Sequence, residues 1–482
     1  GTDRDLAREI ERFGNSPAAS GLSYGVVFRG LEQPAGDPDP RSGNHGLDDA
    51  APGGLAVNPE TPLIPASVMK LATTITALER LGPAHTFLTE LWTSGNLRGD
   101  TLEGDLYIRG GGDPFLVSER LWLLAAQVRQ LGLRRVTGRL VLDRSRFSPP
   151  FQDPARSASR EVSQRPYGAR LSALAVNFNA AAIRVSAGAA AGSPALVEAD
   201  PLPCAYISID NRLRTLAPGE RAAWDAQLVP AAGGEVFRVT GTIARAASPT
   251  EAGQGEVVYR SVRDPDAFSL SLTEAFLREA GVIIEGGTAQ DTLPAGARLL
   301  LSFPSLTVQE LVAKINRFSN NLMTDMLAMA IPARETASLE AAAAEIAAHL
   351  RSSHGAGDGV RIVDGSGLSA GNRLTAGLVA HLLQAAWSDL DVLPALLGSL
   401  PGPGEDGTLR RRFKSERLPL RAKTGTMNDQ PASSLAGYLQ DAEGRTIAFA
   451  MLMNAPPGGS WTVPRMQDLQ EQWVRIYLRP AP

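Results

Sequence analysis

Helix-forming and strand-forming patterns divide this chain of 482 residues into three stretches, and their order limits the folds that it can adopt. Apolar residues at helical spacing, mixed with a few strand-like runs, characterise residues 1–86 and 268–482. Between them, residues 87–267 consist mainly of short β-like runs separated by Gly and Pro turns. We therefore expect one discontinuous α+β domain, built from the two outer stretches and interrupted by a large β-rich insertion of two lobes.

The outer stretches also predict the layers of their domain. Four strand-like segments are expected to form an antiparallel sheet: residues 22–29, 418–425, 434–440 and 446–454. Amphipathic helices at residues 3–13 and 464–478 carry apolar residues on one face, so both are expected to cover this sheet. The remaining helices of the outer stretches predict a helical subdomain beside it.

Composition excludes several classes of function. The formal net charge of −4 gives no support for a nucleic-acid partner. No apolar run approaches the roughly 18 residues of a membrane span, which leaves only peripheral membrane contact open. Cys204 is the one cysteine, and the five histidines lack the spacing of a metal motif. We expect neither a metal site nor a cofactor.

The first candidate for chemistry is the pair Ser67 and Lys70, at the start of an apolar helix that Pro65 introduces. Residues three apart on a helix share a face, so the hydroxyl and the amine lie side by side. A serine hydroxyl becomes a good nucleophile when a neighbouring base takes its proton, and a desolvated lysine can be that base. Only four of the 47 basic residues are lysines, whereas arginine cannot serve as a neutral base.

Two further motifs occur later in the chain. Ser319-Asn320-Asn321 interrupts an apolar helical stretch, where three polar residues either cap a break or line a cleft. Lys423-Thr424-Gly425-Thr426 ends a strand-like segment, and its small residues allow a ligand to approach the backbone. S-x-x-K, S-D-N and K-T-G are the motif set of class A β-lactamases and penicillin-binding proteins, and the three motifs stand here in that order, with Asn in the middle of the second.

The sequence resembles the low-molecular-mass class C penicillin-binding proteins, which are D-alanyl-D-alanine carboxypeptidases and endopeptidases. The resemblance covers nearly the whole chain, because further family-like stretches lie at residues 104–114, 171–179, 363–369 and 435–438. It implies a transpeptidase-type domain with a large insertion between the first two motifs. Asn320 stands where many members have Asp, and Thr324-Asp325 replaces a frequent Ala-Glu pair.

The resemblance and the residue chemistry together imply the roles of the five catalytic residues. Ser67 is expected to attack the substrate carbonyl, and a neutral Lys70 to accept its proton. Ser319 is expected to pass a proton to the departing amine, while Asn321 holds the substrate amide and Lys70. Lys423 is expected to stay charged, so that the two lysines would hold opposite protonation states.

The resemblance also implies how substrate is held. Thr424 and Thr426, with Gly425 between them, are expected to bind the terminal carboxylate together with Lys423. The backbone N–H groups of Ser67 and Thr426 would form an oxyanion hole. An acidic residue of the insertion is expected to bind the amine of a diaminopimelate side chain, and Asp143 is the candidate; the alternative is a residue that only closes a turn at a strand end.

The predicted function is therefore a serine DD-peptidase that cleaves peptidoglycan stem peptides through an acyl-enzyme and is acylated covalently by β-lactam antibiotics. Such an enzyme would act in the periplasm or elsewhere outside the cytoplasm, with a signal peptide taken to have been removed. Two other interpretations stay open. One is a serine β-lactamase or esterase, which would turn over its acyl-enzyme quickly. The other is an inactive scaffold that binds peptidoglycan.

Overall fold

The protein is described by a computed structural model that covers residues 2–31, 54–149, 168–246 and 255–479. The chain forms two compact units, and each unit contains segments that are distant in sequence. Unit 1 comprises Gly1–His85, Thr307–Ala333 and Leu339–Pro482, and unit 2 comprises Thr86–Leu306 and Arg334–Ser338. No helix in these described ranges is both long and apolar enough to cross a membrane.

Unit 1 is built on a five-stranded antiparallel sheet with the strand order β18-β19-β20-β1-β2. Its strands are β1 (Ser23–Gly30), β2 (Leu55–Val57), β18 (Leu420–Met427), β19 (Ala432–Gln440) and β20 (Thr446–Asn454). The side chains of β19 and β20 are buried along nearly their whole length. Burial of successive residues means that both faces of the sheet are covered, which explains why these strands read as continuous apolar runs.

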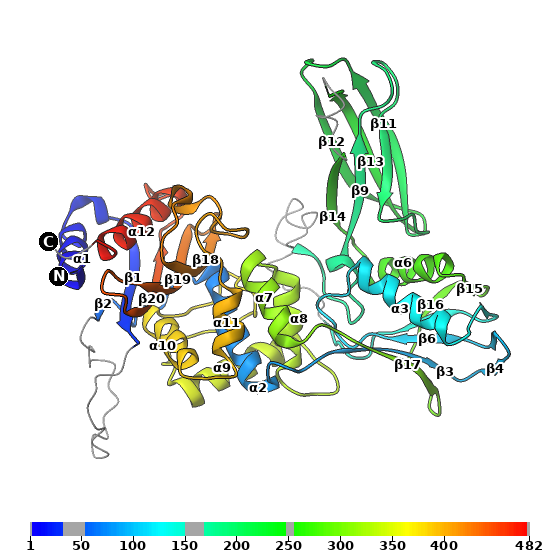
Figure 1. The fold of residues 1–482 in the computed structure, drawn as a ribbon, viewed down its shortest axis with the longest axis horizontal. Coiled ribbons are helices and arrows are strands. Elements are labelled where there is room, and N and C mark those ends of the chain that lie inside the picture. The colour runs from blue at the N-terminus through cyan, green and yellow to red at the C-terminus, as the bar shows by residue number, and fades with distance from the viewer. Residues whose placement is uncertain (1, 32–53, 150–167, 247–254, 480–482) are drawn as a thin grey trace. The chain divides into compact units, whose positions relative to one another are not determined.

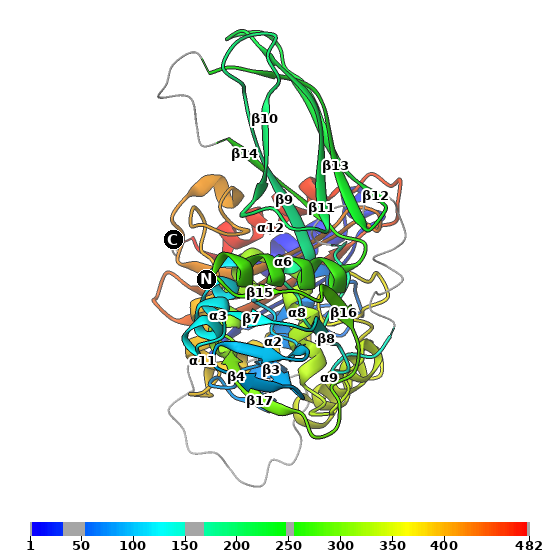
Figure 2. The ribbon, with the colours of Figure 1, turned by 90° about the vertical axis from the view of Figure 1, so that its right-hand side faces the viewer.

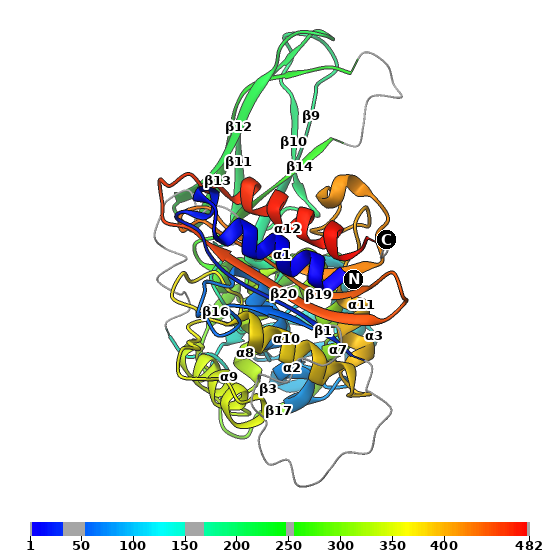
Figure 3. The same cartoon turned by 90° about the vertical axis from the view of Figure 1, so that its left-hand side faces the viewer.

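The two terminal helices cover one face of this sheet. Helices α1 (Thr2–Gly14) and α12 (Val463–Tyr477) lie side by side across the strands (Figure 3). Leu6 and Ile10 of α1 and Trp473 of α12 are fully buried in the core between helices and sheet. Helix α10 (Ala376–Trp387) contacts β1 and β20 on the sheet as well. The predicted arrangement of both terminal helices on one sheet is confirmed.

The helical part of unit 1 is organised around α2 (Met69–Leu81), of which every residue from Met69 to Leu78 is buried. Four helices contact α2: α7 (Val308–Phe318), α8 (Asn321–Ala330), α9 (Leu339–His354) and α10. The short helix α11 (Leu393–Ser399) packs on α7. The central position of α2 fixes the segment immediately before it, η2 (Ala66–Val68), which contacts β18.

Unit 2 contains an α/β part and a strand-only part. The α/β part has a five-stranded sheet, β16-β8-β6-β3-β17, and a four-stranded sheet, β15-β7-β5-β4. These strands are β3 (Leu88–Thr93), β4 (Asn96–Arg98), β5 (Thr101–Glu103), β6 (Leu106–Arg109), β7 (Arg135–Val136), β8 (Leu140–Asp143), β15 (Ile283–Ile284), β16 (Thr288–Gln290) and β17 (Arg298–Pro304). Helices α3 (Ser118–Gln130) and α6 (Pro265–Glu279) pack against each other beside them (Figure 2).

The strand-only part of unit 2 extends away from α3 and α6 (Figure 1). It consists of two three-stranded sheets, β10-β9-β14 and β11-β13-β12. Its strands are β9 (Ala180–Ser186), β10 (Leu196–Asp200), β11 (Ile207–Leu216), β12 (Ala223–Ala231), β13 (Gly234–Ala244) and β14 (Glu256–Ser261).

One predicted boundary differs from the observed units. The insertion was expected to end at residue 267, but unit 2 continues to Leu306. Strand β17 pairs with β3, and β15 and β16 extend the sheets of β7 and β8. Helix α6 packs on α3 of the same unit. A helical pattern in the sequence does not indicate which sheet the helix will cover, so α6 was assigned to the wrong side of the boundary.

Candidate active site

Ser67 lies in the 3-10 turn η2 that leads into α2, and its side chain is half-buried. The preceding residue, Ala66, has a φ of 45°, a left-handed conformation that costs energy for a residue with a side chain. Two glycines make room for this turn. A Cβ on Gly367 would stand 1.9 Å from the Ala66 carbonyl oxygen, and a Cβ on Gly425 would stand 2.9 Å from Ser67 N. The backbone at Gly367 on one side and at Gly425 on the other therefore holds the strained turn in place.

Lys70 lies one helical turn after Ser67 and is completely buried. Its Nζ is 3.1 Å from Ser67 Oγ and 2.6 Å from Asn321 Oδ1. It also donates to the carbonyl oxygen of Ser366 at 2.6 Å. Three polar groups from three different segments hold the amine in place, and one of them is the serine hydroxyl whose proton a general base would accept.

The second motif forms the joint between α7 and α8. Ser319 ends α7 in the left-handed conformation, with φ 58° and ψ 39°. Asn320 caps α8, because its side chain accepts a hydrogen bond from Met323 N at 3.0 Å. Asn321 is the first residue of α8. The polar motif therefore both caps a break and lines the site, since its outer residues reach different lysines: Asn321 contacts Lys70, and Ser319 contacts Lys423.

Lys423 is in β18 and is completely buried. Its Nζ donates to Ser319 Oγ at 2.9 Å and to the carbonyl oxygen of Thr424 at 2.7 Å. Burial, and after it the positive charge of Lys70, lower the pKa of the Lys423 amine well below its ordinary value of 10.5. The expectation that Lys423 stays charged therefore depends on a counter-charge, which a bound carboxylate would supply.

The rest of the third motif continues from Lys423 along β18. Thr424 is almost fully buried, and Thr426 is exposed. Gly425 lies against η2, where a side chain would meet Pro65 O, Ser67 N and Val68 N within 3.0 Å. The backbone of β18 thus passes directly beside the N–H group of Ser67.

A loop that the sequence patterns did not assign to the site completes it. Residues 364–372 present the Ser366 carbonyl oxygen to Lys70. Buried Asp364 holds this loop, because its carboxylate accepts hydrogen bonds from Gly367 N at 2.6 Å and Ser369 N at 2.7 Å. Asp325 of α8 is also buried and accepts from Gly365 N at 3.0 Å. Asp364 and Asp325 are therefore positioning residues. The contact of Ser366 with Lys70 could not be predicted from the sequence, because every residue type has a backbone carbonyl.

Asp143 lies in the other unit, at the end of β8. It is 3% exposed, and its two carboxylate oxygens accept hydrogen bonds from Ser145 N at 2.8 Å and Leu293 N at 3.1 Å. These contacts are those of a residue that closes a turn at a strand end. A role for Asp143 in substrate binding stays a prediction.

One group of side chains in the described residues has the spacing of metal ligands: Glu79, His349 and His354. Glu79 belongs to the last turn of α2, whereas Ser67 precedes the first turn. A helix rises about 1.5 Å per residue, so roughly 18 Å separates Glu79 from Ser67 along the helix axis. The group is therefore distinct from the lysine and serine cluster.

Known proteins similar to this chain agree on one family. A model of the D-Ala-D-Ala carboxypeptidase 3 (S13) family matches residues 55–474. A D-alanyl-D-alanine carboxypeptidase of an Actinomadura species is 34% identical over 423 residues, which cover 82% of this chain and 74% of the relative.

Solved structures show the same fold. Penicillin-binding protein 4 of Haemophilus influenzae superimposes with a TM-score of 0.72 at 22% identity, over 95% of this chain and 97% of that one. The same Haemophilus influenzae protein complexed with a β-lactam superimposes with a TM-score of 0.68 at 22% identity, over 99% of each chain. The predicted fold class is thus confirmed.

Proposed function

Because the chain belongs to the D-Ala-D-Ala carboxypeptidase 3 (S13) family, it is a serine-type D-Ala-D-Ala carboxypeptidase, and we propose that one cluster in unit 1 carries out its reaction. The cluster consists of Ser67, Lys70, Ser319, Asn321 and Lys423. The observation that carries the assignment is the position of Lys70 Nζ, 3.1 Å from Ser67 Oγ.

The proposed reaction has two halves. In the first, the Oγ of Ser67 attacks the carbonyl carbon of the penultimate D-Ala, while the neutral amine of Lys70 accepts the hydroxyl proton. The bond to the terminal D-Ala breaks, its nitrogen receives a proton through Ser319, and an ester with Ser67 remains. In the second half, water attacks the ester, and the proton returns to Ser67 Oγ. The short contact between Lys70 and Asn321 supports this use of Lys70, because it keeps the amine in place during both halves.

The two lysines divide the work of binding and proton transfer. We propose that the terminal carboxylate of the substrate binds at Lys423, with the hydroxyls of Thr424 and Thr426 beside it. A carboxylate there favours the charged form of Lys423, whose pKa is lowered in the absence of a ligand by burial and by Lys70. Charged Lys423 in turn disfavours a proton on Lys70. Binding of a free carboxylate would thus prepare the base, which explains a preference for a C-terminal D-Ala.

The oxyanion hole is proposed to consist of the backbone N–H groups of Ser67 and Thr426. The close approach of Gly425 to Ser67 N supports this pairing, because it brings the two backbone segments together. Loss of one oxyanion donor costs about 3 kcal/mol of transition-state stabilisation in comparable enzymes. The left-handed turn at Ala66 holds the Ser67 N–H in position before substrate arrives.

The proposed substrates are peptidoglycan stem peptides, and the proposed location is outside the cytoplasm, in the periplasm or an equivalent space. Crosslinked and uncrosslinked stem peptides differ only in the group on the C-terminal side of the cleaved D-Ala bond, so endopeptidase activity on crosslinked peptides is proposed as well. β-Lactams are proposed to acylate Ser67. The β-lactam complex of the Haemophilus influenzae protein, which shares this fold, supports that proposal.

Intact-protein mass spectrometry with benzylpenicillin tests the assignment. We expect one penicillin added per chain, an adduct that persists for hours, and no adduct on Ser67→Ala. An adduct that disappears within minutes would indicate a β-lactamase, and a wild-type chain without adduct would indicate an inactive scaffold. Digestion of purified monomeric and crosslinked muropeptides then measures carboxypeptidase and endopeptidase activity separately.

A further inference from the structure

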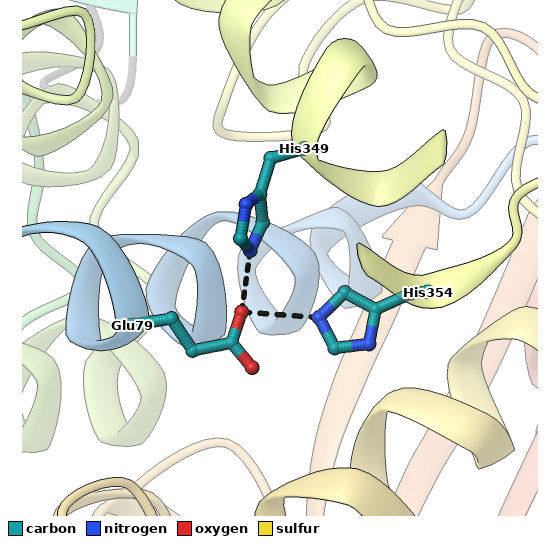
Figure 4. A group of neighbouring side chains, drawn as sticks. All are labelled: Glu79, His349 and His354. Carbon is teal, nitrogen blue, oxygen red and sulfur yellow. Dashed lines mark hydrogen bonds and ion pairs between the residues drawn. The ribbon is translucent and has the colours of Figure 1, made fainter. Parts of the chain in front are cut away.

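Three side chains meet at the far end of α2. Glu79 comes from the last turn of α2, and His349 and His354 come from the last two turns of α9 (Figure 4). The Nε2 atoms of both histidines point to the same carboxylate oxygen: Glu79 Oε2 lies 2.5 Å from His349 Nε2 and 3.0 Å from His354 Nε2. All three potential ligand atoms lie within 4.8 Å of one another.

The three side chains are shielded from solvent. Those of His349 and His354 are 9% and 6% exposed, and that of Glu79 is 18% exposed.

The orientation of the imidazoles also suits a metal. His349 Nδ1 lies 3.4 Å from Ser353 Oγ, on the side of the ring away from Glu79. Metal-binding histidines usually bond through their second ring nitrogen to a neighbouring polar group, which fixes the tautomer and leaves the first nitrogen for the ion. Two imidazoles and one carboxylate are a ligand set typical of Zn²⁺, with one coordination position left for water.

The distances allow an ion to enter with little movement. Zn²⁺ is bound at about 2.0–2.2 Å by nitrogen and oxygen, so tetrahedral ligands lie roughly 3.3 Å apart. The nitrogen–oxygen distances of 2.5 Å and 3.0 Å must therefore each open by less than ~1 Å to reach this separation. Rotation of the flexible Glu79 side chain supplies such a movement without a change in either helix.

We propose that Glu79, His349 and His354 bind one divalent transition-metal ion of the Zn²⁺ class, which clamps the end of α2 to the end of α9. The site lies at the end of α2 opposite to Ser67, and peptide cleavage as proposed above does not use it. Metal binding would stabilise the helix that carries the nucleophile and the base. The spacing of histidines in the sequence could not predict this site, because Glu79 is 270 positions away from His349.

The test is titration of the full chain, first treated with a chelator, with Zn²⁺ and Co²⁺ at neutral pH. We expect saturable binding of one ion per chain by calorimetry, a rise of several degrees in the unfolding temperature with Zn²⁺, and the visible absorption of low-symmetry Co²⁺. Glu79→Gln and His354→Ala should each weaken Zn²⁺ binding by about 10-fold to 100-fold. Release of D-Ala should proceed with or without the ion.

Glu345→Gln is the matched control, because it removes another ion pair between α2 and α9, that of Arg80 and Glu345 at 2.9 Å. This variant should bind Zn²⁺ as tightly as the wild type. The proposal is overturned if the wild type binds no ion at one equivalent, or if Glu79→Gln and His354→Ala bind Zn²⁺ unchanged. It is also overturned if Glu79→Gln lowers the unfolding temperature but Zn²⁺ leaves that of the wild type unaltered, because the group is then only an ion pair. None of these results bears on the role of Ser67.

Discussion

The two units of the molecule bury charged side chains to the same extent but in different ways. In unit 1, Lys70 and Lys423 are completely buried, and their contacts come from segments that are distant in sequence. In unit 2, Asp113 and Asp143 are 2% and 3% exposed, and each accepts a hydrogen bond from the backbone N–H two residues further along. Burial alone therefore does not identify a functional group, and neither does a single contact from a distant segment, because Asp143 also accepts from Leu293 N. The two amines differ in that side chains from distant segments bind them.

The buried lysines of unit 1 and the buried aspartates of unit 2 differ in how much free energy their burial costs the folded protein. A carboxylate that bonds to a backbone N–H two residues on satisfies a local turn, which any strand end can use. A buried amine whose pKa is lowered by burial and by a second buried amine, as at Lys423, is unfavourable for stability, and such shifted groups cluster at functional sites. Substitutions in each unit can test whether this difference between the units holds.

The largest effect is expected for Lys70→Arg. A guanidinium cannot lose its proton at ordinary pH, so the base is removed while the positive charge is kept. The rate of penicillin acylation should fall by about 10³-fold or more. Reactions quenched at successive times and analysed by intact-protein mass spectrometry would measure the acylation rate, and circular dichroism would check that the variant is folded. Acylation of Lys70→Arg at the rate of the wild type would show that Lys70 is not the base.

The next effect is expected for Gly367→Ala, which tests whether backbone packing positions Ser67. A Cβ at this position would stand 1.9 Å from Ala66 O, so the turn before Ser67 must move. A displacement of about 1 Å can reduce kcat/KM by about 10²-fold.

Gly444→Ala is the matched control for Gly367→Ala. Gly444 has a φ of +79°, against +80° for Gly367, but nothing lies within 4 Å of an added Cβ. Both variants place a side chain at a similar positive φ, but only Gly367→Ala should lose activity in a D-Ala release assay. Equal kcat/KM values for the two variants would contradict the proposed support of Ser67.

A smaller effect, on stability alone, is expected for Asp113→Asn in unit 2. Burial raises the pKa of Asp113 from 3.8 to about 6. The folded protein therefore holds this proton more tightly than the unfolded chain, and stability is lost as pH rises through about 4 to 6. Asn resembles the uncharged form, so at pH 7.5 the variant should be more stable than the wild type by on the order of 2 kcal/mol.

Urea unfolding at pH 4 and pH 7.5 measures this difference for Asp113→Asn. The advantage of the variant should be present at pH 7.5 and nearly absent at pH 4. An advantage of the same size at both pH values would mean that the charge of Asp113 is not its cause.

The smallest effect is expected for Asp143→Asn. The new amide group cannot accept the hydrogen bond from Leu293 N, so unfolding should become easier by about 1 kcal/mol. KM for a peptide that carries diaminopimelate should stay unchanged if Asp143 only closes the turn. A rise in KM for this peptide, but not for one with an uncharged side chain in its place, would instead assign Asp143 to substrate binding and weaken the contrast between the units.

The five proposed catalytic residues could be predicted from the sequence because the proposed reaction uses their side chains, which restricts the residue types and their order. The structure brings Ser67, Lys70, Ser319, Asn321 and Lys423 together as expected from the motifs. The support for this cluster could not be predicted. Ser366 acts through its backbone carbonyl, which every residue type possesses, and Gly367 acts through an absent side chain.

Tertiary pairing explains the other differences. The boundary at residue 268 was misplaced because the pairing of β17 with β3 decides to which unit α6 belongs, and such pairing leaves no local pattern. Likewise, Glu79 and His349 become neighbours only through the packing of α2 on α9. Patterns within a single segment predicted many of its helices and strands, whereas contacts between segments could be found only in the structure.

The joint between α7 and α8 has a consequence for inhibition. Ser319 and Asn321 stand two positions apart in one turn of chain, yet each engages a different lysine. A molecule that wedges this joint open would remove the Asn321 contact of Lys70 and the Ser319 contact of Lys423 in a single movement. Such a compound would act without forming a bond to Ser67, so it need not carry an electrophile.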